Sequence, residues 1–148
     1  MADLQERGCM TEADPADTYE QQVQAIQGAN QPILDGFENA LRQAGLSEPT
    51  IKAHVDNMRF FGRYLLWYGS SLRQLDEATE GDVYDFLEDW FPRKALWASV
   101  SSMKVYLASF KKFFTWMGET GLVPPETVED VRSTLKDSRS LFLRKVAE

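Results

Sequence analysis

Residues 96–118 read LWASVSSMKVYLASFKKFFTWMG, and this stretch decides the fold. Large apolar residues recur along it in steps of four and three, at Leu96, Val100, Met103, Leu107, Phe110, Phe114 and Met117. This is the period of one face of an α-helix, so the stretch predicts an amphipathic helix that stops at Gly118. The opposite face carries only small or basic residues, namely Ser101, Lys104, Ala108, Lys111 and Thr115. We therefore expect one face to be buried and the other to be open.

Two upstream patterns predict further helices. Residues 32–45 have an apolar face of helical period and end at a glycine suited to a C-cap. Residues 47–69 predict a second helix with Ser47 as N-cap, and apolar residues on two of its sides indicate packing against two neighbours. The exposed stripe expected on this second helix consists of Lys52, Asp56, Arg59 and Arg63.

The rest of the chain also has a helical pattern. Residues 79–92 predict a third, acidic helix that begins at a capping box of Thr79 and Asp82 and is stopped by Pro92. A fifth helical segment is expected after Pro124, with a continuation towards the C-terminus. No strand pattern and no repeat is found. The sequence therefore predicts an all-α fold, a compact bundle of four to five helices.

Composition divides the chain into three parts. Residues 1–30 are polar, acidic and poor in large apolar side chains, so we expect a flexible acidic leader, or a short helix over residues 17–26. We expect the helical domain over residues 31–131 and a C-terminal helical tail or interdomain linker over residues 132–148.

The totals exclude several classes of protein. Cys9 is the only cysteine, which rules out an internal disulfide and favours a reducing, cytoplasmic location. No apolar run is long enough to span a membrane, and the first residues lack the pattern of a secretory signal. The net charge of −7 argues against nucleic-acid binding unless the charge is localised.

The charge is indeed segregated along the chain. Residues 1–30 hold six acids against Arg7, and residues 71–92 hold seven acids against Arg73. Residues 93–118 carry five bases and no acid, and residues 132–148 carry five bases and two acids. Solubilising charge blocks on a helical surface remain an alternative explanation of this pattern.

Three stretches resemble a known family. GLSEPTIK at residues 45–52 resembles the start of the second helix in the N-terminal SAM-like, or core-binding, domain of phage-integrase-type tyrosine recombinases. LRQLDEATEGDVYDFL at residues 72–87 resembles that domain's third helix. LASFKKFFTWM at residues 107–117, followed by Gly121 and Leu122, resembles the end of its fourth. The stretches follow in the family's order, and the resemblance covers residues 32–131.

The resemblance implies a SAM-like bundle that forms one half of a clamp on duplex DNA and serves DNA integration and recombination. Its partners would be double-stranded DNA, other recombinase protomers or a catalytic domain. The DNA-binding residues that it implies are Thr50, Lys52, Arg59, Arg63, Ser101, Ser102, Lys104, Lys111 and Lys112. The mixture of small, hydroxyl and basic side chains in residues 101–112 independently suits contact with phosphates.

No catalytic constellation is recognisable. Strand cleavage in this family resembles transfer of a phosphoryl group to a tyrosine, assisted by arginines and a histidine or lysine in a separate C-terminal domain. His54, the sole histidine, is not followed by the arginine of an H-x-x-R motif and is interpreted as a surface or partly packed imidazole. One histidine and one cysteine cannot complete a metal site, and no cofactor or small-molecule substrate is expected.

Two function classes remain open at this stage. The first is a DNA-binding module of a tyrosine recombinase, or a free-standing relative, that clamps DNA without catalysis. The second is a protein-interaction or self-association module on the same scaffold, which the acidic net charge favours. Pairing with Asp56 or the acidic third helix is an equal alternative for Arg59 and Arg63, and solubilisation is an alternative for Lys104 and Lys111.

Overall fold

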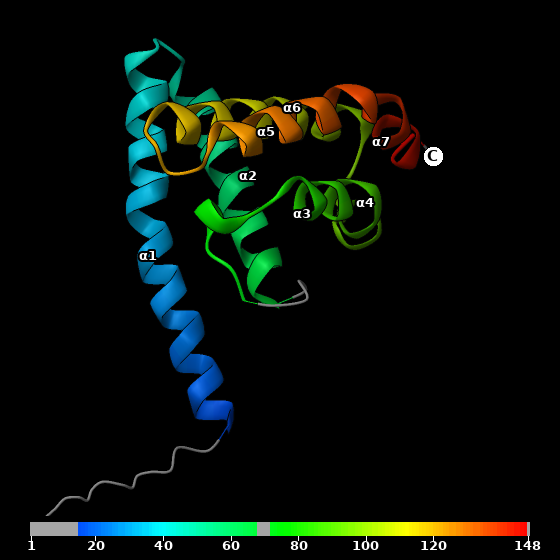
Figure 1. The fold of residues 1–148 in the computed structure, drawn as a ribbon. Coiled ribbons are helices and arrows are strands. Elements are labelled where there is room, and N and C mark those ends of the chain that lie inside the picture. The colour runs from blue at the N-terminus through cyan, green and yellow to red at the C-terminus, as the bar shows by residue number, and fades with distance from the viewer. Residues whose placement is uncertain (1–14, 68–71, 148) are drawn as a thin grey trace, which may run out of the picture.

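A computed structural model describes residues 15–67 and 72–147 of the protein (Figure 1). The described residues are almost entirely helical, and they contain no strand. The predicted all-α fold is therefore confirmed, with more helical elements than the four to five expected. The long helices are α1 (Pro15–Gln43), α2 (Glu48–Trp67), α5 (Val100–Glu119) and α6 (Pro125–Asp137). The short elements are η1 (Leu75–Glu77), α3 (Glu80–Asp85), η2 (Phe86–Trp90), α4 (Phe91–Lys94) and α7 (Arg139–Lys145).

Helix α5 is the central element of the bundle. It packs against α2 on one side and α6 on another, and α1 crosses its C-terminal half (Figure 1). The predicted core stripe is buried from Met103 to Met117. Edge-to-face ring pairs join α5 to its neighbours. The ring centroids are 4.8 Å apart for Phe61 of α2 and Phe110, and 5.0 Å apart for Phe37 of α1 and Phe113.

The predicted helix starts at Ser47 and Thr79 are confirmed. The Ser47 Oγ accepts a hydrogen bond from the backbone N–H of Thr50 at 3.4 Å, and α2 begins at the next residue, Glu48. In the capping box of α3, the Asp82 carboxylate accepts from the Thr79 N–H at 2.9 Å. Asp82 also forms an ion pair with Arg73, so this cap is tied to the preceding segment.

Helix α1 begins much earlier than the sequence indicated. Residues 15–30 were expected to belong to a flexible leader, or to hold a short helix over residues 17–26, yet they form one continuous helix with residues 31–43, and Pro32 lies inside it. Tertiary contacts account for this: Val23 is buried, and the Asn30 side chain accepts a hydrogen bond from the Leu75 N–H at 2.9 Å. Residues 1–14 of the expected leader lie outside the described residues.

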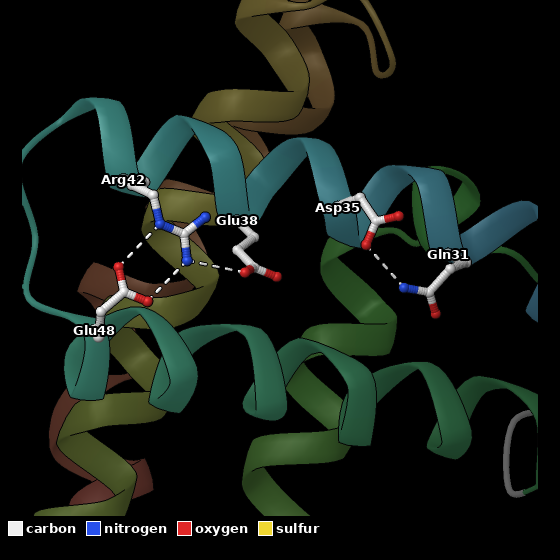
Figure 2. Close-up of polar contacts among 5 residues, drawn as sticks. All are labelled: Gln31, Asp35, Glu38, Arg42 and Glu48. Carbon is white, nitrogen blue, oxygen red and sulfur yellow. Dashed lines mark hydrogen bonds and ion pairs between the residues drawn. The ribbon is translucent and has the colours of Figure 1, made fainter.

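Arg42 links the end of α1 to the first turn of α2 (Figure 2). Arg42 donates to Glu38 on its own helix at 3.0 Å and to both oxygens of Glu48 at 2.8 and 2.9 Å. These bonds lower the pKa of the Glu48 carboxyl and raise the pKa of the Arg42 guanidinium. Further back along α1, Gln31 donates to Asp35 at 2.9 Å. The first turn of α2 is thereby held against the end of α1.

Two expectations about the segment before α5 are wrong. Pro92 does not stop the third helix, because the chain passes through the π-helical turn η2 and continues as α4 to Lys94. Pro92 lies in the first turn of α4, where its missing N–H costs little. Leu96 was assigned to the core stripe, but it lies in the turn before α5 and is 100% exposed.

Helices α6 and α7 complete the bundle. The expected domain boundary at residue 131 falls inside α6, and both Leu135 and Phe142 beyond it are buried in the common core. Helix α6 runs back alongside α5 (Figure 1). Gly118 of α5 lies in tight contact with α6, because an added Cβ there would lie 2.5 Å from the Val128 Cγ2.

Candidate nucleic-acid interface

The start of α5 determines which of its side chains face outwards. Ser99 is the N-cap: its Oγ accepts from the Ser102 N–H at 3.1 Å, and the Ser102 Oγ accepts from the Ser99 N–H at 2.8 Å. Of the two predicted DNA-binding serines, Ser102 is therefore occupied by the cap, whereas Ser101 is exposed.

Basic side chains occupy the open face of α5. Lys104, Lys111 and Lys112 are all exposed, and Ala108 lies between the first two on the same face. Within residues 15–67 and 72–147, no ion pair involves any of these three lysines. Their charges are therefore available to an external anion.

A groove of about 710 Å³ runs along this face. One wall is α5, with Lys104, Ala108 and Lys111, and the other is made by α6 and the first residue of α7. The second wall contributes the basic residues Arg132, Lys136 and Arg139, together with the acids Glu129 and Asp137. Residues of a region that we expected to be a tail or linker thus share a surface with the predicted α5 lysines.

A second hollow, of about 430 Å³, lies on the other side of Lys104. It is lined by the start of α2, with Pro49, Thr50, Ala53 and His54, and by Lys104, Val105 and Ala108 of α5. Thr50 and Lys104, which are far apart in the sequence, therefore border the same depression. The α5 face is continuous from the start of α2 to α6.

The exposed stripe of α2 forms a different surface. Asp56 accepts from Lys52 at 2.6 Å and from Arg59 at 3.1 Å, so both cations are already paired. Arg63 is exposed, and with Arg59 it lines a hollow against Asn30 and Gln31 of α1. The structure thus separates the predicted DNA-binding residues into an α5 group with unpaired lysines and an α2 group in which Lys52 and Arg59 share the carboxylate of Asp56.

Comparison with known proteins identifies the domain. A sequence profile described as phage integrase, N-terminal SAM-like domain, matches residues 33–122, more than half of the chain. The chain belongs to this family. The match is to the N-terminal SAM-like domain, and it includes the start of α2 and the whole of α5. No curated protein and no solved structure gives a significant match.

Sequence reasoning missed the second wall of the groove in this SAM-like domain. Arg132, Lys136 and Arg139 lie beyond the matched residues, and they were assigned to no site. A signal for them existed, because residues 132–148 carry an excess of bases. What the sequence could not show is that α6 folds back along α5 and places these bases opposite Lys104 and Lys111.

The described part of the SAM-like domain contains neither a cluster of metal ligands nor a membrane-spanning helix. No group of three or more His, Cys, Asp or Glu side chains within it is arranged to hold a metal ion. Likewise, none of its helices combines the length and apolar character needed to cross a bilayer.

A buried polar contact joins α2 to α5 beneath the interface of the SAM-like domain. His54, expected at the surface or partly packed, is 4% exposed, and its Nδ1 lies 2.6 Å from the Ser109 Oγ. Asn57 also donates to that hydroxyl at 3.1 Å. Burial lowers the pKa of His54, with a smaller contribution from the positive charge of Lys112. The imidazole is therefore neutral in the folded domain near pH 7.

This burial predicts a loss of stability in mild acid. Since the folded pKa of His54 lies below its unfolded value of about 6.5, the unfolded chain takes up the proton first. The free energy of unfolding should be constant above that pH and fall as the pH drops towards the folded pKa. Urea denaturation at pH 7.5 and 5.5 would measure the fall, which His54→Gln should reduce. An equal fall in the variant would contradict the assignment to His54.

Proposed function

We propose that this SAM-like domain binds duplex DNA through the open face of α5 and does so without catalysing strand cleavage. The observation that carries the proposal is the pair Lys104 and Lys111, which are exposed, unpaired within the described residues, and aligned along one groove. Lysines free of carboxylates can neutralise phosphates and release the counterions condensed on DNA, which is the main source of affinity in such complexes.

The neighbouring residues suit the approach of a DNA backbone. Ala108 lies between the two lysines, and its small side chain leaves room for a close approach. Ser101 and Thr50 present exposed hydroxyls that can donate to phosphate oxygens. The acids of α3 and η2 do not line the groove, and Glu88 of η2 is already paired with Lys145 at 2.9 Å.

Three of the five tyrosines, Tyr19, Tyr64 and Tyr106, have surroundings that support a non-catalytic role. Burial raises the pKa of the Tyr64 and Tyr106 hydroxyls, which disfavours a reactive phenolate. The Tyr19 hydroxyl donates to the Leu66 carbonyl at 2.9 Å. A cleaving tyrosine must reach a phosphate flanked by cationic groups, and none of these three lies at the groove. Chemistry would belong to a separate catalytic domain, and the cytoplasm is the compartment in which we expect the complex to form.

A salt titration of duplex binding tests the proposal. Contact with four or five phosphates predicts that the logarithm of the association constant falls against the logarithm of salt concentration with a slope of about −4. Fluorescence anisotropy of a labelled duplex of about 20 base pairs would measure this slope. The salt concentration would run from about 50 to about 300 mM, where the affinity of such complexes falls steeply. A slope near zero would refute binding through phosphates.

A second candidate function is supported by one exposed apolar site. Leu96 is fully exposed and Trp97 is 53% exposed, in the turn between α4 and α5. Adjacent exposed apolar side chains often mark a contact with another protein. If the duplex does not bind, a protein-interaction or self-association module becomes the better assignment, and sedimentation velocity would then show whether copies of the chain associate.

A further inference from the structure

The groove wall formed by α6 and α7 carries basic residues of its own, in addition to the lysines of α5. Arg132 and Lys136 are one helical turn apart and both exposed, and Arg139 follows at the start of α7. All three lie beyond residue 122, where the family match ends. Together with Lys104 and Lys111 they place basic side chains on both walls of one groove.

The groove is lined by more bases than acids. Glu129 and Asp137 are the acids among the described residues that line the groove, and neither forms an ion pair with any of its five bases. Like charges on facing walls of the groove repel one another. An anion seated between the walls would remove this repulsion, and a groove focuses the field of its walls on such a ligand.

The groove extends over two helical turns of α5, from Lys104 to Lys111, which is longer than a single ion requires. The contact of Gly118 with Val128 fixes the approach of α5 and α6 at one end, and Lys104 and Arg139 lie towards the other. Lys104 and Lys111 are separated by two helical turns, or about 10.5 Å along the axis. Over that length of its axis a duplex presents about three phosphates on each strand.

We propose that this groove holds the phosphate backbone of one strand of duplex DNA, with Lys104 and Lys111 on one side and Arg132, Lys136 and Arg139 on the other. The inference rests on the proposed function and extends it to α6 and α7. These helices are then part of the DNA-binding surface, and a fragment that ends at residue 122 lacks half of the groove.

The test compares two double variants with the same change of charge in the full-length chain. Arg132→Ala with Lys136→Ala removes two bases from the groove, and Arg93→Ala with Lys94→Ala removes one arginine and one lysine that do not line it. The first should make the salt slope shallower by about 1.8, from 0.9 for each contact. The second should leave the slope unchanged. The swap Arg132→Lys with Lys136→Arg should keep the wild-type slope, because charge rather than side-chain shape is required.

The outcomes separate this inference from the proposed function. If the wild type binds duplex with a steep slope but the Arg132 and Lys136 variant behaves like its control, α6 is not part of the surface and the inference fails alone. If the wild type shows no salt-dependent binding, the proposed function fails as well. Binding of labelled polyglutamate as tightly as a duplex of equal charge would overturn the inference in favour of an acidic polypeptide. Unchanged thermal denaturation confirms that each variant is folded.

Discussion

Replacing Lys104 and Lys111 together with alanine is expected to weaken duplex binding by on the order of 30-fold at 0.15 M salt. The size follows from counterion release, in which each lost phosphate contact removes about 0.9 from the log–log slope. Both side chains are exposed and unpaired among the described residues, so their loss leaves no buried carboxylate behind. The fold should therefore be unaffected, and the defect should be one of binding alone.

The matched comparison is Lys52→Ala with Arg59→Ala. This pair also removes two positive charges, but both cations are already in ion pairs with Asp56. We expect a much smaller loss of affinity, measured by the same anisotropy titration. An equal loss from the two variants would mean that net charge, or the α2 stripe, dominates, and the assignment of the interface to α5 would be wrong.

The fold was predictable where local pattern and tertiary packing agree. The steps of three and four residues in 100–117 correctly placed Met103, Leu107 and Phe110 in the core. Ser47 and Thr79 correctly marked helix starts, because a cap satisfies backbone donors with atoms that are adjacent in sequence. Such signals need no knowledge of the rest of the chain.

The prediction was wrong where distant contacts decide the outcome. Nothing near Asn30 in the sequence shows that its side chain will bind the Leu75 backbone 45 residues away, yet this contact helps to hold the first half of α1. Pro92 is a strong helix breaker in isolation, but a π-helical turn before it lets the chain continue. Leu96 continued the apolar period by chance, because the cap at Ser99 starts the helix only at Val100.

The candidate site was predictable in part for the same reason. The free lysines of α5 follow from a stretch that lacks acids, and the pairing of Lys52 with Asp56 follows from their spacing of one helical turn. The groove itself does not follow from any local pattern. It depends on how α6 packs against α5, and that packing depends on a glycine, Gly118, whose lack of a side chain admits Val128.

Phe86→Ala is expected to lower the free energy of unfolding by about 3–5 kcal/mol, the range for an aromatic residue deleted from a core. Phe86 is fully buried at the junction of α3 and η2. Its ring centroid lies between 5.3 and 6.1 Å from those of Phe60, Phe61, Tyr64, Trp90, Phe91, Tyr106 and Phe110. Truncation leaves a cavity that these rings, which come from α2, α5 and the η2–α4 segment, can fill only in part.

The control for this prediction is Leu96→Ala. The sequence placed Leu96 in the same core, whereas the structure leaves it fully exposed, so its truncation should change stability by less than about 0.5 kcal/mol. Urea denaturation, monitored by tryptophan fluorescence, would measure the free energy of unfolding of both variants. Unchanged m-values would show that the difference lies in the native state. A loss above about 1 kcal/mol for Leu96→Ala would mean that this side chain is covered after all, and the start of the core stripe would return to where the sequence placed it.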